Sequence, residues 1–259
     1  MGRTIAVANQ KGGVGKTTTA INLSACLAEK NKKVLTIDID PQGNTTSGLG
    51  VDKNSAENTI YELFLDECSL EDCIQNSVME NLTVIPSNIN LSGAEIELIS
   101  MEEKEYLLKN KLDQIKDDYD FIIIDCPPSL NLLTVNAMVA ADTVLVPIQC
   151  EYYALEGLSQ LMHTIDLIKE RLNPKLEIEG VVFTMYDART NLSSQVVENV
   201  KENLNKKIYK TIIPRNVRLA EAPSYGMPIN MYDGRSAGAE AYRFLAEEVI
   251  EREDEDAWL

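Results

Sequence analysis

The sequence predicts an α/β fold in which a doubly wound, mostly parallel sheet carries helices on both faces. Three observations predict it. Short runs rich in β-branched residues alternate with helix-length segments, several of these runs are apolar at every position, and a glycine-rich loop joins the first run to the first helical segment. A parallel sheet that is covered on both faces has no solvent side that would demand alternating polarity. We expect residues 1–259 to form one domain.

Seven strands are expected along the chain, and the clearest is an unbroken apolar run at 121–124 that leads directly into an aspartate. The expected strands lie at residues 5–9, 33–38, 82–86, 121–125, 143–148, 178–185 and 209–214. The expected helices lie at residues 16–30, 102–116, 130–141, 154–172, 193–204 and 238–252. The stretch 51–81 is the least regular, and its Glu, Asp and Asn content is typical of a solvated surface excursion.

Composition excludes several classes of protein. A chain with 44% hydrophobic and 25% charged residues is neither collagen-like nor disordered. A net charge of −17 argues against broad attraction to nucleic acid or membrane. The five cysteines show no C-x-x-C spacing, so we expect them to be reduced in a cytoplasmic protein. The chain enters its first strand at once and shows no apolar window near about 18 residues, so we expect neither a leader peptide nor a membrane span.

A phosphate-binding loop is predicted at residues 9–18, which read N-Q-K-G-G-V-G-K-T-T between the first strand and the first helix. Backbone N–H groups of such a loop converge on phosphate oxygens, and the helix N-terminus adds its positive end. Lys16 is expected to reach the β- and γ-phosphates of ATP, and the Thr17 hydroxyl to ligate Mg²⁺. This context predicts a P-loop NTPase. The expected nucleotide-binding residues of the loop are Lys11, Gly12, Gly13, Val14, Gly15, Lys16, Thr17 and Thr18.

Carboxylates follow two of the expected strands. Residues 38–46 read D-I-D-P-Q-G-N-T-T, which puts Asp38 and Asp40 at the sheet edge where open α/β folds bind ligands. The alternative for each, and above all for Asp38, is a buried aspartate that caps a helix. Asp125 ends the apolar run 121–124 and precedes a double proline that stiffens the next turn. We expect Asp125 to bind Mg²⁺ through water.

The loop departs from the common G-x-x-x-x-G-K-[ST] pattern, because Gln10 stands at its first glycine position and Lys11 adds a second lysine. This variant, K-G-G-x-G-K-T-T, resembles the deviant Walker A loop of the ParA/MinD/nitrogenase iron protein superfamily. There the first lysine crosses a dimer interface to the phosphates of the partner's ATP, so the resemblance implies a nucleotide-sandwich dimer and a catalytic role in trans for Lys11. Asp40 resembles the family's switch I aspartate, which positions the attacking water and supports metal coordination; with Lys16 it completes the expected catalytic set.

Segments 149–157 and 213–224 extend the resemblance to nearly the whole chain and are similar to the chromosomal ParA branch, often called Soj. The resemblance implies a slow, Mg²⁺-dependent ATPase of chromosome or plasmid partitioning in the cytoplasm, associated with the nucleoid. The ATP dimer would bind double-stranded DNA nonspecifically, and a ParB/Spo0J-type centromere-binding protein would stimulate hydrolysis and release it. Pro214, Arg215 and Asn216 would line the base pocket.

Other functions are weighed against this one. A nucleotide-switched regulator of replication initiation or sporulation would use the same dimer to bind a replication initiator. A P-loop metabolic synthetase would use ATP as a cosubstrate. An iron–sulfur protein would need cysteines that hold a cluster between two subunits. Cys126 and Cys150 are present, but the motifs around them match the partitioning branch instead. A MinD-like protein would end in a basic membrane helix, whereas residues 251–259 are acidic, so we expect no membrane partner.

Charge is segregated along this acidic chain, because residues 181–246 hold nine Lys and Arg against six Asp and Glu. Arg189 and Arg218 stand where Soj-like proteins resemble one another in carrying DNA-contacting arginines. The alternative for each is solvated surface charge or an ion pair. The expected contacts are to phosphate and insensitive to sequence. The full set of expected DNA-binding residues is Arg189, Arg218, Lys206, Lys207 and Lys210.

Overall fold

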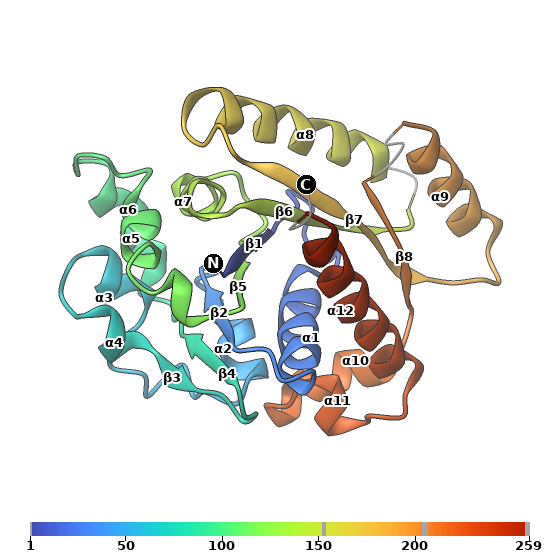
Figure 1. Ribbon diagram of the computed structural model, residues 1–259, viewed down its shortest axis with the longest axis horizontal. Helices are drawn as coiled ribbons and strands as arrows, with labels where there is room; N and C mark the ends of the chain where they lie inside the picture. Colours follow the sequence, from blue (N-terminus) through green and yellow to red (C-terminus); the bar gives the residue numbers. More distant parts are fainter. Residues whose placement is uncertain (1, 152–153, 204–206, 257–259) are drawn as a thin grey trace.

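A computed structural model of the chain describes residues 2–151, 154–203 and 207–256. Its centre is an eight-stranded sheet with the order β3-β4-β2-β5-β1-β6-β7-β8, shown in Figure 1. All neighbouring strands pair in parallel except β3 with β4, which confirms the predicted doubly wound, mostly parallel fold. The strands are β1 (Arg3–Val7), β2 (Val34–Asp38), β3 (Gln75–Asn76), β4 (Leu82–Ile85), β5 (Phe121–Asp125), β6 (Thr143–Gln149), β7 (Glu177–Tyr186) and β8 (Ile208–Pro214).

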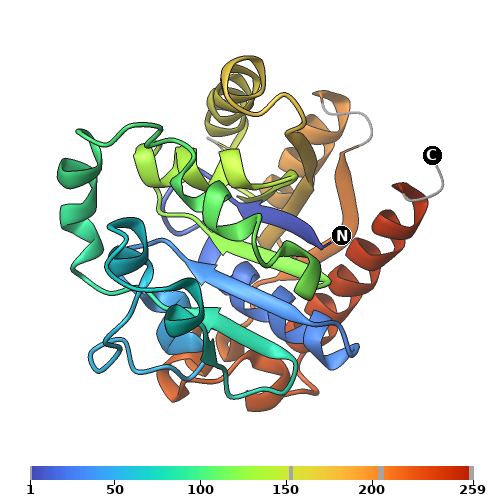
Figure 2. The same cartoon turned by 60° about the vertical axis from the view of Figure 1, so that its left-hand side comes forward.

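Helices connect the strands and lie on both faces of the sheet (Figures 1 and 2). The longer ones are α1 (Lys16–Glu29), α5 (Leu91–Leu98), α6 (Leu107–Leu112), α7 (Leu132–Ala140), α8 (Ala154–Arg171), α9 (Asn191–Asn203) and α12 (Ala237–Asp256). The short ones are α2 (Asn44–Gly48), α3 (Ile60–Phe64), α4 (Leu70–Cys73), α10 (Val217–Glu221), α11 (Ile229–Tyr232) and the 3₁₀ turns η1 (Lys116–Asp118) and η2 (Ala222–Tyr225). Among the residues described, no helix combines the length and apolar character needed to cross a membrane.

Two hydrophobic cores form because successive side chains of a strand point to opposite faces of the sheet. Ala6 and Ile124 belong to the core under α7 and α8. Ile5 and Ile123, their neighbours in the chain, belong to the core under α1 and α12. Both sets are fully buried, which explains why the central strands are apolar at every position.

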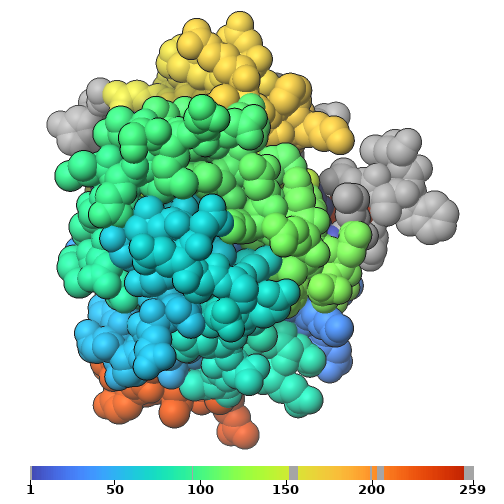
Figure 3. Space-filling model, turned by 90° about the vertical axis from the view of Figure 1, so that its left-hand side faces the viewer, coloured from blue at the N-terminus to red at the C-terminus, as the bar shows by residue number. Residues whose placement is uncertain are grey.

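The stretch 51–81 is more ordered than predicted, so its interpretation as a solvated excursion is wrong. It forms α3, α4 and β3, and its light-blue to cyan atoms occupy part of the face seen in Figure 3. Its residues Ile60, Phe64 and Leu70 are buried in the core. Elements of two to five residues are too short to show a hydrophobic period, which explains why these three were not predicted. The eight-residue α5, which lies beyond this stretch, was not predicted either.

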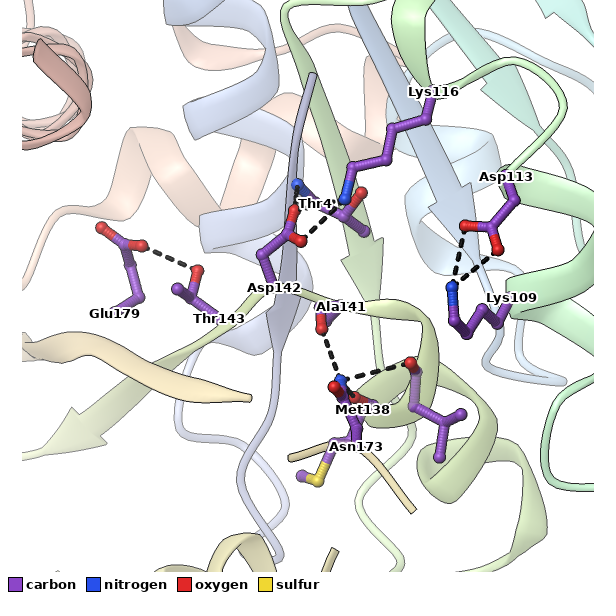
Figure 4. Close-up of polar contacts among 11 residues, drawn as sticks. Thr4, Lys109, Asp113, Lys116, Met138, Ala141, Asp142, Thr143, Asn173 and Glu179 are labelled. Carbon is purple, nitrogen blue, oxygen red and sulfur yellow. Dashed lines mark hydrogen bonds and ion pairs between the residues drawn. The ribbon is translucent and has the colours of Figure 1, made fainter. Parts of the chain in front are cut away.

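The amino edge of the sheet, where the parallel strands begin, is stabilised by polar contacts (Figure 4). The Asp142 carboxylate accepts hydrogen bonds from the Thr4 N–H at 2.8 Å and from the Lys116 ammonium at 2.7 Å. The Thr143 hydroxyl donates to the buried Glu179 carboxylate at 2.7 Å. These contacts pair the charged side chains at this edge, whereas the predicted nucleotide residues lie at the opposite, carboxyl edge.

Candidate nucleotide-binding site

The glycine-rich loop joins β1 to α1 and borders open space. Gly13 and Gly15 adopt left-handed conformations, with φ of 74° and 90°, which favour glycine. A Cβ atom built on Gly13 would meet no heavy atom within 4 Å. Helix α1 begins after Gly15 with no side-chain cap, so its first N–H groups are available to an anion. The loop therefore has the form of a phosphate cradle.

Two side chains that the sequence analysis did not single out position this loop. The buried Thr184 hydroxyl of β7 donates to the Val14 carbonyl at 2.7 Å. The Asn9 side chain donates to the Pro147 carbonyl of β6 at 2.8 Å and accepts from the Lys11 N–H at 3.0 Å. These bonds attach the loop to two neighbouring strands, so its shape is set before any ligand binds.

Lys16 crosses the inside of the loop. Its ammonium donates to the Lys11 carbonyl at 3.1 Å, and the side chain is buried. Burial lowers the pKa of Lys16, and the nearby carboxylates of Asp125 and Asp40 oppose that shift. The loop thus holds a buried cation at the place where the β- and γ-phosphates are expected.

Two aspartates lie side by side at the carboxyl ends of β2 and β5, where Asp38 pairs in register with Asp125. Both are fully buried. Burial raises the pKa of both carboxyls, and for Asp125 the charge of Asp38 adds to the rise. One Asp125 oxygen, Oδ2, accepts hydrogen bonds from the hydroxyls of Thr17 at 2.8 Å and Thr45 at 2.7 Å. The other, Oδ1, is buried and has no hydrogen-bond partner among the residues that the structure describes.

This orphaned oxygen fits the predicted Mg²⁺ ion. A buried carboxylate oxygen without a partner is costly unless a cation satisfies it. Asp125 and the Thr17 hydroxyl supply the hard oxygen ligands that Mg²⁺ takes, usually together with water and substrate phosphates. Because the two side chains already meet, the residues present fit a magnesium ion beside the phosphate cradle.

Asp38 and Asp40 play different parts. Asp38 accepts from the N–H and the hydroxyl of Thr46, each at 2.8 Å, so it caps the N-terminus of α2, the alternative that the sequence left open. Its second oxygen accepts from the Asp40 N–H at 3.1 Å. Asp40 is half-buried and is oriented by the Gln42 N–H at 2.9 Å. Asp40 is also near enough to Lys16 and Asp125 to influence the pKa of both. Asp38 therefore fixes the turn that presents Asp40 to the site.

Lys11 lies at the rim of the loop and forms an ion pair within its own chain. Its ammonium is 2.6 Å from the carboxylate of Glu151, which follows β6, and both side chains are partly exposed. Glu151 stands in segment 149–157, which carried the family resemblance, but no pattern in the sequence indicates its contact with Lys11. Lys11 is thus paired with a carboxylate of its own chain.

The expected base-pocket residues lie on the same edge of the sheet but away from the loop. Pro214 ends β8, three strands and roughly 14 Å from β1 across the sheet. The Arg215 N–H donates to the Tyr186 carbonyl at 3.0 Å. The Asn216 side chain caps α10 by accepting from the Arg218 N–H at 2.8 Å. These residues therefore lie at the same edge of the sheet as the phosphate cradle and make local contacts there; their part in a base pocket stays a prediction.

The two expected DNA-binding arginines lie beyond the carboxyl ends of neighbouring strands, Arg189 in the turn after β7 and Arg218 in helix α10 after β8. Arg189 is 86% exposed and donates two hydrogen bonds to Asp187, at 2.8 and 2.6 Å. Arg218 is 54% exposed and pairs with Glu221 at 2.9 Å. Both are therefore in surface ion pairs, yet both guanidinium groups remain open to solvent.

The described lysines of the expected DNA-binding set lie elsewhere. Lys207 precedes β8 at the amino edge and pairs with Glu177 at 2.9 Å. Lys207 is separated from Arg218 by the length of β8, roughly 23 Å. Lys207 and Lys210 line a hollow of about 990 Å³ together with Glu248 and Glu251. The expected residues therefore do not gather on one basic face; Lys206 lies outside the described residues.

Comparison with known proteins shows which family the chain belongs to. The family model described as an AAA domain matches residues 2–178. Over 249 residues the chain is 59% identical to the sporulation initiation inhibitor protein Soj of Bacillus subtilis, covering 96% of this chain and 98% of that protein. Over 253 residues it is 51% identical to the chromosome partitioning protein ParA of Myxococcus xanthus, covering 98% and 89%.

A solved structure with the same fold is that of cobyrinic acid a,c-diamide synthase from Mycobacterium smegmatis with bound ADP and magnesium. Its TM-score is 0.85 at 37% identity, and the match covers 96% of this chain and 94% of that one. The chain thus shares its fold with a protein described as a cobyrinic acid a,c-diamide synthase, but its sequence identity to that protein, 37%, is lower than its 59% identity to Soj. At 59% identity over nearly its whole length, the chain belongs to the ParA/Soj family of deviant Walker A ATPases.

Proposed function

We propose that this chain is a Mg²⁺-dependent partitioning ATPase that dimerises on ATP, binds double-stranded DNA nonspecifically as the dimer, and leaves DNA when hydrolysis is stimulated by a ParB/Spo0J-type centromere-binding protein. It would work in the cytoplasm on the nucleoid. The observation that carries the proposal is the buried, partnerless Asp125 oxygen beside Thr17, at the mouth of a loop that holds a buried Lys16.

Within one chain the roles follow from position. Lys16 would neutralise charge on the β- and γ-phosphates, and Thr17 and Asp125 would hold Mg²⁺. The ion would neutralise charge that develops on the phosphate oxygens. Asp40 would orient the attacking water and support the metal. Its carboxylate accepts a hydrogen bond from the Gln42 N–H, and its own N–H donates to the Asp38 carboxylate. These groups are already positioned in the free protein, so little rearrangement is required when ATP binds.

Lys11 would act in trans. It lies at the rim of the loop rather than inside it, and its ammonium is partly exposed. In the free chain this ammonium is paired with Glu151 at 2.6 Å, so it must leave Glu151 before it can reach the phosphates of a partner subunit. The ion pair would therefore oppose dimerisation until bound ATP offers a more strongly charged partner.

DNA would bind at the carboxyl edge, where Arg189 lies in the turn after β7 and Arg218 in α10 after β8. The register pair Tyr186 and Pro214, and the hydrogen bond from Arg215 to Tyr186, keep the ends of these two strands next to each other. Arg189 would exchange Asp187 for a DNA phosphate, and Arg218 would exchange Glu221 and Asp233. One such patch is weak, and dimerisation joins two of them into one avid surface. We place Lys207 and Lys210 outside this surface, because acidic side chains share their hollow.

The test is an electrophoretic shift of random-sequence duplex with and without ATP. If each subunit neutralises about two phosphates, the slope of log K against log [salt] should be roughly −3 to −4. A centromere-containing duplex should bind equally well in the absence of the partner, since only backbone is contacted. A synthetase would show no ATP-dependent shift. A regulator that acts on a replication initiator would dimerise on ATP but would need that protein, rather than DNA, for its effect.

A further inference from the structure

Two cysteines outside the nucleotide site face each other at the ends of α4. The Cys68 sulfur lies 2.9 Å from the Cys73 sulfur. A disulfide bond is about 2.05 Å long, so the two atoms are within about 1 Å of bonding distance. Both are free thiols in the structure. None of the roles assigned to the nucleotide site uses either residue.

Local structure brings the two sulfurs together. Ser69 begins α4 with a capping box, in which its hydroxyl accepts from the Asp72 N–H at 3.2 Å and donates to the Asp72 carboxylate at 2.7 Å. This single turn places Cys68, which precedes the N-cap Ser69, beside Cys73, the last residue of α4. Cys73 is further fixed by its thiol, which donates to the Thr59 carbonyl at 3.5 Å. The contact is therefore built into the turn.

The two thiols differ in access. Cys68 is half-buried, so a small oxidant can reach it, whereas Cys73 is buried behind it. Burial and the hydrogen bond with Cys68 raise the pKa of the Cys73 thiol, which keeps Cys73 from being the first to react with an oxidant; it gives up its proton only when its sulfur attacks an oxidised Cys68. The other three cysteines, Cys26, Cys126 and Cys150, are buried at separate sites in the two cores. Cys68 is thus the residue that reacts first, and Cys73 is the one that resolves the product.

We propose that Cys68 and Cys73 are a thiol oxidation site that closes to a reversible disulfide when the protein meets hydrogen peroxide. The Cys68 sulfur takes one oxygen from peroxide to give a sulfenic acid, and the first water leaves. The Cys73 sulfur then attacks the Cys68 sulfur; the S–O bond breaks as the S–S bond forms, and the hydroxyl departs with the Cys73 proton as the second water. Two thiols are oxidised and one peroxide is reduced to two waters. A dithiol reductant restores both thiols by exchange.

The first test is thiol counting on the full chain. After peroxide treatment, the protein is unfolded, alkylated and weighed. The parent should fall from five alkylated cysteines to three, lose about 2 Da before alkylation, and recover all five with dithiothreitol. Cys68→Ser and Cys73→Ser should each lose the ability to form the bridge. The matched control Cys26→Ser keeps the pair, so it should still lose two thiols.

Peptide mapping then locates the bond, and hydrogen exchange measures its effect. The expected product links residues 68 and 73 within one chain, and it should slow amide exchange around α4 in a way that reductant reverses. Five alkylated cysteines after oxidation would overturn the proposal. So would a Cys68 sulfenic acid that persists without bridging, a bridge between two chains, or a bridge that involves Cys26, Cys126 or Cys150.

Discussion

The ion pair between Lys11 and Glu151 offers a direct perturbation of dimerisation. Glu151→Gln keeps the size of the side chain and removes its charge. If the pair retains Lys11 in cis, the variant should dimerise more tightly with ATP, because Lys11 no longer has to leave a carboxylate. ATP binding by the monomer should not change, since Lys16, Thr17 and Asp125 are untouched.

The expected change in the dimer dissociation constant depends on how exposed the two paired side chains are. The Lys11 and Glu151 side chains are 37% and 46% exposed, so the pair belongs among surface ion pairs, worth about 0.5 kcal/mol. A symmetric dimer breaks two such pairs, which gives about 1 kcal/mol and a dimer dissociation constant lowered about fivefold. Salt screens exposed charges, so the difference between parent and variant should shrink as salt rises.

The assay is sedimentation velocity over a protein concentration series with Mg²⁺ and a non-hydrolysable ATP analogue. The matched control is Asp113→Asn, which removes the pair between Lys109 and Asp113 (Figure 4). That pair has the same 2.6 Å separation and side-chain exposures of 41% and 52%, but it lies on α6, away from the loop. Its loss should leave dimerisation unchanged. Unchanged dimerisation of Glu151→Gln would mean that the ion pair does not hold Lys11 back, and weaker dimerisation would mean that Glu151 supports the dimer; either result contradicts a role for the pair in opposing dimerisation.

Further substitutions separate the roles within the site. Lys16→Ala should abolish productive binding of ATP and Mg²⁺ in calorimetry, whereas Lys11→Ala should bind ATP as a monomer and fail to dimerise; normal dimers from both would contradict the sandwich model. Asp40→Ala should bind ATP and accumulate as dimer, with turnover reduced to background, and turnover at the parental rate would remove Asp40 from hydrolysis. Arg189→Glu and Arg218→Glu should each weaken DNA binding without affecting dimerisation, and neutralising either arginine should make the salt slope shallower by about two; unchanged DNA affinity would place the DNA surface elsewhere.

The parts of the fold that could be predicted are those with local signals. The parallel strands are continuous apolar runs, so their positions are visible in the chain without knowledge of their neighbours. The glycine-rich loop and Asp125 are likewise defined by short patterns next to a strand. By contrast, α3 and α4 have only five and four residues. The local sequence feature that marks each helix is the pair of polar residues in its capping box, such as Thr59 with Glu62.

The rest of the site depends on contacts between distant residues. Glu151 reaches Lys11 across 140 positions of sequence, and Thr45 reaches Asp125 across 80. Neither contact leaves a pattern in one sequence. The separation of Lys207 from Arg218 was also hidden, because the two are close in the chain and the intervening strand carries them to opposite edges of the sheet. The net charge of a segment does not indicate at which edge of the sheet each of its residues lies.

The central claim is that ATP alone converts this chain from monomer to dimer. The most direct measurement is light scattering of Asp40→Ala after size exclusion, without nucleotide, with ADP, and with ATP and Mg²⁺, because slow hydrolysis cannot then erase the product. We expect the mass of one chain without nucleotide and with ADP, and the mass of two chains with ATP and Mg²⁺. Adding Lys11→Ala to this variant should return the mass to one chain while ATP stays bound. One mass under all three conditions, or a dimer that survives the loss of Lys11, would show that ATP does not join two chains through Lys11.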